Sequence, residues 1–247
     1  MNSRLGFFPH LITGLNIFCG FQALLYTMNQ NYIPAAWLII LAGIFDVLDG
    51  KVARLIKSTS ELGVELDSMA DVVSFGIAPA ILFYSVLTSS GKTHPILWLV
   101  PFAYLTAGIF RLVRFNMVSK KKKNLSSKEN FMGLPIPAAA FAISSYIIFT
   151  QDYFGEFAYG DFFLILMVIV SILMVSTIEF RSFPRISFQS PSERIIMVLL
   201  FSSIIAIAIL PRKMFFVITM YYIFYYPVKK LIRLVRYYFS SETKVEP

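Results

Sequence analysis

The sequence predicts an all-α membrane protein, a polytopic bundle of about eight transmembrane helices, from two observations. Of its 247 residues, 57% are hydrophobic and 15% are charged, whereas a soluble globular chain carries about 25% charged residues. The apolar residues are also gathered into runs that approach the roughly 20 residues a helix needs to cross a bilayer. The expected spans are residues 8–28, 34–54, 66–88, 95–116, 134–151, 161–179, 194–210 and 213–233.

The length predicts one bundle. The last two spans carry no acidic residue, so we expect them to be an addition to a six-helix core in residues 1–180. Residues 181–240 would add two transmembrane helices, separated only by a tight turn at Pro211, Arg212 and Lys213, and residues 241–247 would form a disordered tail. No small-residue cleavage site follows the first apolar run, so we expect a retained helix there and not a signal peptide.

The basic residues lie mainly in loops beside the apolar runs, although the net charge is +8. With a cytoplasmic N-terminus, only Lys92, Arg212 and Lys213 of the 22 lysines and arginines would lie outside. This bias places both termini on the cytoplasmic side. It also indicates that the basic residues contact anionic lipid headgroups and do not bind nucleic acid.

Four aspartates stand near the ends of the second and third spans, at Asp46, Asp49, Asp67 and Asp71. Spacings of three and four place each pair on one helix face. Carboxylates at membrane depth are costly unless they meet cations or a polar cavity. Four oxygen ligands of this kind suit Mg²⁺ or Mn²⁺, on the side that the charge bias makes cytoplasmic.

Small and basic residues surround the aspartates. Gly50 and Ala53 leave a surface with almost no side chain, against which a flat ligand could press. Arg54 is a planar donor suited to phosphate, and Gly63 suits a close approach or the turn into the next helix. The whole pattern reads Asp46-x2-Asp49-Gly50-x2-Ala53-Arg54-x8-Gly63-x3-Asp67-x3-Asp71.

This pattern resembles the signature of the CDP-alcohol phosphotransferases, membrane enzymes that make phospholipids from CDP-activated lipids. The resemblance implies a CDP-lipid-binding set, which would include Gly50, Ala53, Arg54 and Gly63. It also implies two metal ions on the four aspartates, with Asp71 as the general base, and a homodimer in a prokaryotic cell membrane.

Polar residues in the first and fourth spans extend the candidate site. Thr13 and Asn16 either bond to neighbouring helices or line the nucleotide site. Arg111 and Arg114 either extend to the membrane surface or clamp a phosphate or a carboxylate, with Asn116 as a further polar contact.

The stretches FRLVRFN and Gly-Leu-Pro-Ile-Pro, at 133–137, are similar to the integral-membrane phosphatidylserine synthases of bacteria and archaea. These would transfer a phosphatidyl group from CDP-diacylglycerol to L-serine. In that branch Arg111, Arg114 and Asn116 would bind the acceptor. His10 stands where the family often has asparagine, and its role stays open.

Three alternatives remain at this point. The acceptor could be glycerol 3-phosphate or an inositol phosphate, because two arginines could also hold a phosphate. The donor could be an ether lipid, because no residue in the apolar helices distinguishes an ether from an ester linkage of the lipid chains. A cation transporter would also carry intramembrane acids, but the Gly-x-x-Ala-Arg spacing has no role in one.

Overall fold

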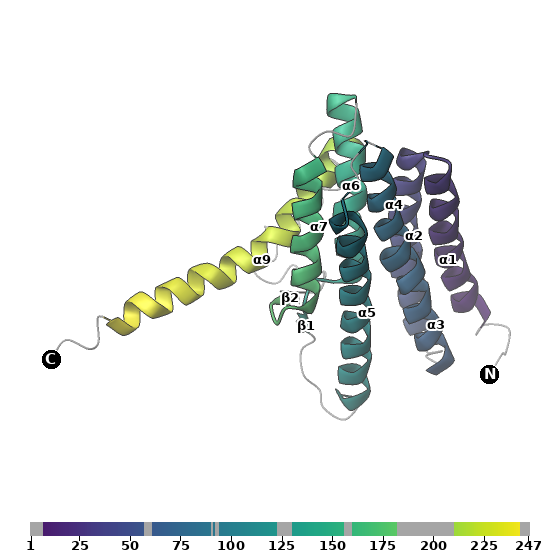
Figure 1. The fold of residues 1–247 in the computed structure, drawn as a ribbon. Helices are drawn as coiled ribbons and strands as arrows, with labels where there is room; N and C mark the ends of the chain where they lie inside the picture. The colour runs from purple at the N-terminus through teal and green to yellow at the C-terminus, as the bar shows by residue number, and fades with distance from the viewer. Residues whose placement is uncertain are drawn as a thin grey trace.

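The computed structural model describes residues 7–56, 61–89, 91, 94–122, 130–155, 160–181 and 210–242, and in these the chain is a helical bundle (Figure 1). Its helices are α1 (Phe7–Met28), α2 (Tyr32–Ile56), α3 (Glu61–Asp71), α4 (Ala78–Ser89), α5 (Ile96–Lys122), α6 (Ile136–Phe154), α7 (Gly160–Val175) and α9 (Pro211–Glu242). A π-helical turn, η1 (Val72–Ile77), joins α3 to α4. Two short strands, β1 (Asn130–Met132) and β2 (Glu179–Arg181), pair antiparallel.

The expected all-α membrane class is confirmed, whereas the count of eight spans is not. Among the described residues, four segments are long and apolar enough to cross a membrane, and Gly160–Val175 is a shorter apolar helix. The four are His10–Met28, Tyr32–Val52, Leu62–Ser89 and Ile96–Val118. They coincide with the first four predicted spans. Of the predicted seventh span, 194–210, only its last residue lies within the described residues.

The C-terminal helix begins two residues earlier than expected. Pro211, Arg212 and Lys213 are the first residues of α9, and the predicted helix before them lies outside the described residues except for its last residue. A proline is favourable there, because the first N–H groups of a helix have no partner within it. Helix α9 also continues to Glu242, two residues into the predicted disordered tail, and 243–247 lie outside the described residues.

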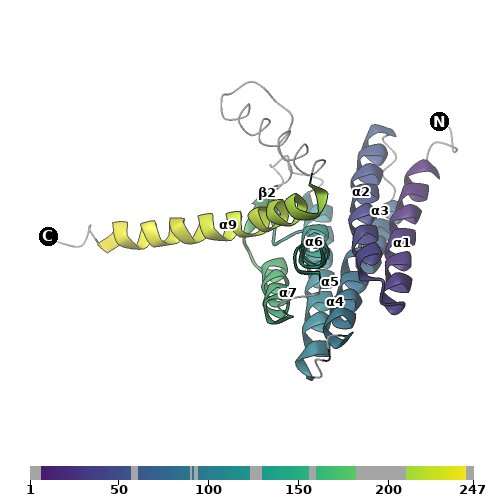
Figure 2. The same cartoon turned by 90° about the horizontal axis from the view of Figure 1, so that it is seen from above.

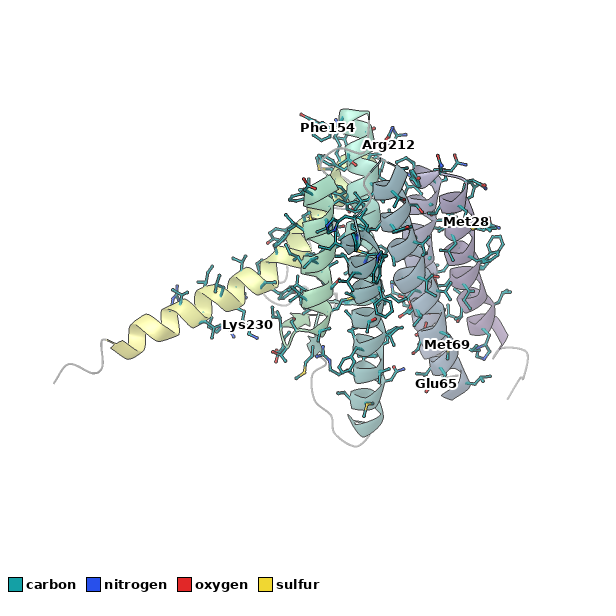
Figure 3. The ribbon with its side chains drawn as sticks, in the orientation of Figure 1. Met28, Glu65, Met69, Phe154, Arg212 and Lys230 are labelled. Atoms are coloured by element: carbon teal, nitrogen blue, oxygen red, sulfur yellow. The ribbon has the colours of Figure 1, made fainter. Side chains whose placement is uncertain are left out.

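Successive helices cross the bundle in alternating directions. Figure 3 places Met28, Phe154 and Arg212 at one end of the bundle and Glu65 and Met69 toward the other. The start of α1, the end of α2, the start of α3 and the β1–β2 pair therefore share the second end, which is the end nearer Asp67.

Helix α6 lies at the centre and packs against α2, α4, α5, α7 and α9 (Figure 2). Its small residues Ala139 and Ala140 are fully buried, as is Ile143 one turn further on. Small side chains let helix backbones approach closely where lipid provides no hydrophobic drive for packing. The helix ends at Gly155, whose φ of 72° is the left-handed conformation that glycine adopts without strain.

The first half of α9 belongs to the packed bundle. Ile223 is fully buried, Phe216 stacks on Phe149 of α6 with ring centroids 4.7 Å apart, and Tyr226 packs on the buried Phe180 of β2. From Val228 onward the described side chains are exposed, and this half projects away from the other helices (Figure 1).

Candidate active site

Three aspartates from two helices form a compact acidic cluster. Asp46 and Asp49 lie on the last turns of α2, and Asp67 lies on α3. One carboxylate oxygen from each can be chosen so that all three lie within 4.8 Å of one another. Asp49 is 5% exposed, and the other two are half-buried. Carboxylates this close repel one another strongly in a medium of low dielectric constant, unless a cation lies between them.

Asp71 lies one turn beyond Asp67 on α3, next to the cluster. It is 8% exposed, and its carboxyl group lies within hydrogen-bonding reach of Asp46. Arg111 of α5 is also buried and interacts electrostatically with both Asp71 and Asp46. The site therefore combines carboxylates from two helices with a guanidinium from a third.

The donor set fits divalent cations. The Oδ1 atoms of Asp67 and Asp71 are buried and make no hydrogen bond among the described residues. A buried carboxylate oxygen without a donor is costly, and a hard cation satisfies it through the oxygen coordination that Mg²⁺ and Mn²⁺ prefer. The predicted ligand set thus meets at one place, and its role in metal binding stays a prediction.

Thr13 of α1 contacts this cluster directly. Its Oγ1 donates a hydrogen bond of 2.9 Å to Oδ2 of Asp49, and it is 6% exposed. Asn16, one turn further along α1, is fully buried, and neither of its side-chain polar atoms has a hydrogen-bond partner among the described residues. Thr13 therefore fixes a candidate metal ligand, whereas binding of the nucleotide by either residue stays a prediction.

The structure describes only part of the predicted CDP-lipid-binding surface. Gly50 lies on α2 directly after Asp49, and Gly63 lies within the first turn of α3, past the inter-helix connection. Ala53 and Arg54 belong to the last turns of α2, but their side chains lie outside the described residues. The predicted contacts of these residues with a CDP-lipid stay predictions.

Arg114 holds backbone groups together. Its guanidinium donates hydrogen bonds of 2.7–3.3 Å to the carbonyls of Met132, Met174, Val175 and Ser176. These carbonyls belong to β1 and to the end of α7, two segments far apart in the sequence. The two arginines predicted as one clamp thus have different surroundings, since Arg111 faces the aspartates.

Gly133 explains why the Gly-Leu-Pro-Ile-Pro stretch begins with glycine. Its φ is +81°, and a Cβ atom there would lie 2.2 Å from the Met174 carbonyl oxygen and 2.6 Å from the Arg114 guanidinium. Its N–H donates to the Ile178 carbonyl at 2.9 Å. Only glycine allows this approach, so the stretch positions the loop that Arg114 binds.

Asn116 of α5 donates a hydrogen bond of 2.8 Å to Oγ of Ser68, the neighbour of Asp67. It thereby connects α5 to the helix that carries two of the aspartates. Ser68 did not emerge from the sequence, although it follows an aspartate of the motif. Its hydroxyl also donates to the Val64 carbonyl, as serines in helices commonly do.

Comparison with known proteins agrees with this arrangement. The sequence model of the CDP-alcohol phosphatidyltransferase family matches residues 7–178, which include every described element of the acidic site. A CDP-diacylglycerol–serine O-phosphatidyltransferase of Helicobacter pylori is 33% identical over 95% of both chains. A protein of the same name from Mycobacterium leprae is 28% identical over 89% of this chain and 73% of its own.

An archaeal relative is also similar. The archaetidylserine synthase of Methanothermobacter thermautotrophicus is 37% identical over 72% of this chain and 70% of its own. The match of the family model over most of the chain, together with an acidic cluster at the positions of the signature, leads to one conclusion. This chain belongs to the CDP-alcohol phosphatidyltransferase family.

Proposed function

We propose that this protein is a phosphatidylserine synthase, which transfers the phosphatidyl group of CDP-diacylglycerol to L-serine and releases CMP. The relatives named above support serine as the acceptor. The observation that carries the proposal is the acidic cluster of Asp46, Asp49 and Asp67 with the buried Asp71 beside Arg111. It offers the charges that phosphoryl transfer to a hydroxyl needs.

Asp46, Asp49, Asp67 and Asp71 would hold two divalent cations, Mg²⁺ or Mn²⁺. Bound there, the ions would neutralise the pyrophosphate of the donor and stabilise the departing CMP. Thr13 would keep the Asp49 carboxylate in the orientation needed for binding, because its hydroxyl occupies one oxygen of that group.

Asp71 would act as the general base. The serine hydroxyl oxygen would attack the phosphorus of the phosphatidyl group and form a new P–O bond, while the bond from that phosphorus to the CMP oxygen breaks. The hydroxyl proton would pass to the Asp71 carboxylate, and CMP would leave with the electron pair. Asp71 is buried directly beside the acidic cluster, which would place its carboxylate near the reacting hydroxyl.

Arg111 would bind the serine carboxylate. Its planar guanidinium matches a carboxylate in two parallel hydrogen bonds, and it already lies beside Asp71. Arg114 is less suited to this task, because its terminal nitrogens already donate to four backbone carbonyls. Asn116 would support the pocket through its hydrogen bond to Ser68.

The CDP-lipid would lie along the end of α2, with its cytidine against Gly50 and Ala53 and its phosphates near Arg54. The archaetidylserine synthase relative favours a second candidate, the same transfer from an ether-lipid donor. We further propose a homodimer, as the resemblance to the family implies. Both termini and the active site would lie on the cytoplasmic side, and the excess of basic residues in the segments assigned to that side supports this orientation.

The test is CMP release by the purified protein from CDP-diacylglycerol with Mg²⁺ or Mn²⁺. L-serine, glycerol 3-phosphate, inositol phosphate and no acceptor would be run in parallel, and an ether analogue would replace the donor in a second series. Serine-dependent release with a matching lipid product supports the proposal. Release with another acceptor alone would keep the family and overturn the substrate.

A further inference from the structure

The helix that carries Asp67 and Asp71 widens directly after Asp71. In the turn η1 the N–H of Ala78 donates to the carbonyl of Val73, five residues earlier, in place of the four of an ordinary α-helix. Such π-helical turns place one extra residue in a helix and occur frequently at functional sites. The wide turn separates the two aspartates from α4.

Pro79 gives this widening a cause. Proline has no N–H, so Pro79 cannot donate to the Phe75 carbonyl four residues earlier, and its ring crowds that carbonyl in a regular helix. The phenol of Tyr104 on α5 donates a hydrogen bond of 2.8 Å to the same Phe75 carbonyl. Tyr104 is 0% exposed, so its hydroxyl is shielded from water and bonds to the Phe75 carbonyl inside the bundle.

Helix α1 holds the wide turn from another side. The Ser74 hydroxyl donates a hydrogen bond of 2.9 Å to the backbone carbonyl of Asn16. Gly20 lets the backbones approach, because a Cβ atom there would lie 2.4 Å from Ser74 Oγ. The turn is therefore bonded to α1, which carries Thr13, and to α5, which carries Arg111.

The width of the turn decides where Asp71 faces. Helix α4 is anchored in the core, since Leu82 and Phe83 are fully buried. Each residue rotates an α-helix by about 100°. Loss of the extra residue would therefore rotate the aspartate face of α3 by about that angle relative to α4, away from Asp46 and Arg111.

We propose that Tyr104 is a positioning residue for phosphatidyl transfer. Its hydroxyl replaces the donor that Pro79 lacks, fixes the wide turn and so keeps Asp71 directed at Asp46 and Arg111. This proposal rests on the role in proton transfer proposed above for Asp71. Tyr104 itself acts through the helix backbone.

The first test is Tyr104→Phe, which removes the hydroxyl and keeps the ring. We expect kcat to fall by about 10- to 100-fold, the cost of misplacing a reacting group by about 1 Å. The KM for serine, measured at saturating Mn²⁺ because Asp71 is also a proposed metal ligand, should stay at its wild-type value, because Arg111 on α5 is unchanged.

Tyr32→Phe is the matched control. Tyr32 is also buried, and its hydroxyl donates to a helix carbonyl, that of Ser85 on α4, at 3.2 Å. It lies far from the aspartates along the helix, so its variant should keep the wild-type kcat. Equal losses of kcat in the two variants would overturn the proposal, because they would indicate general loosening of the bundle.

Pro79→Ala tests the same turn from the other side, since alanine restores an N–H donor that can reach Phe75 in an ordinary α-helical turn. It should also lower kcat, and it decides the question if Tyr104→Phe does not stay folded. In the double variant the losses should be far from additive, because both changes act through one carbonyl. Additive losses, or a wild-type kcat in Pro79→Ala, would overturn the proposal.

The two levels of the proposal fail differently. If the folded wild-type protein releases no CMP with serine, the proposed function is wrong. If the wild-type protein is active and Tyr104→Phe retains its full kcat, only the role of Tyr104 is wrong.

Discussion

Replacement of Thr13 by valine isolates one contact of the acidic site. Valine keeps the branched shape of threonine and removes the hydroxyl that donates to Oδ2 of Asp49 at 2.9 Å. A hydrogen bond to a charged group contributes about 1.5–3 kcal/mol. At about 1.4 kcal/mol for each factor of ten, that corresponds to about a 10- to 100-fold loss of affinity for the metal if the hydroxyl orients its ligand. Loss of an outer contact to a metal ligand typically has an effect of that size.

The assay is serine-dependent CMP release as a function of Mn²⁺ concentration. We expect Thr13→Val to raise the half-saturating Mn²⁺ concentration by that factor and to approach wild-type kcat at saturating metal, because Asp71 and Arg111 are untouched. Thr27→Val is the control on the same helix, since Thr27 is 1% exposed and donates only to the Ala23 carbonyl of its own helix in the bonds observed. An unchanged metal requirement in Thr13→Val would refute the assignment of Asp49 as a ligand oriented by α1.

Three further predictions concern catalysis, the acceptor and stability. Asp71→Asn should abolish turnover and leave part of the CDP-lipid binding, measured as thermal protection by CDP-diacylglycerol; near-wild-type turnover would remove Asp71 from the mechanism. Arg111→Gln should raise the KM for serine by about 10-fold or more, as expected for loss of a charge-assisted pair, and an unchanged KM in the steady-state assay would place the serine carboxylate elsewhere. Gly133→Ala should lower the melting temperature. An alanine with a positive φ costs about 1–2 kcal/mol in strain, and its Cβ would also clash with the Met174 carbonyl. A wild-type melting curve would show that the loop bound by Arg114 is not rigid.

The aspartates were predictable from sequence because their spacing carries the geometry. Intervals of three and four along a helix determine which side chains share a face, and membrane depth makes an unpaired acid costly. Asp46, Asp49 and Asp67 meet in the structure as that reasoning requires.

The wide turn after Asp71 was not predicted, although Pro79 signals it. A proline inside a helix can kink it, end it or widen it, and which of these occurs depends on the neighbours that satisfy the freed carbonyl. Here that neighbour is Tyr104, 29 residues away in the sequence. A tertiary contact of this kind has no local pattern from which it could be recognised.

The two arginines show the same limit. Their spacing of three predicts one shared face, but it does not distinguish a side chain directed at the aspartates from one directed at a loop. Four carbonyls from β1 and α7 surround Arg114. That environment is created by Gly133 and by the end of a helix 60 residues away in the chain, so only the fold reveals it.

The central claim is that this acidic cluster binds the metal that supports transfer to serine. The most direct measurement is incorporation of labelled L-serine into extractable lipid by the purified protein with CDP-diacylglycerol, in Mg²⁺ or Mn²⁺ and after removal of metal with a chelator. We predict labelled phosphatidylserine in amounts that match the CMP released with metal, and none without it. Equal incorporation in the chelator, or no labelled lipid from folded protein with either metal, would contradict the account.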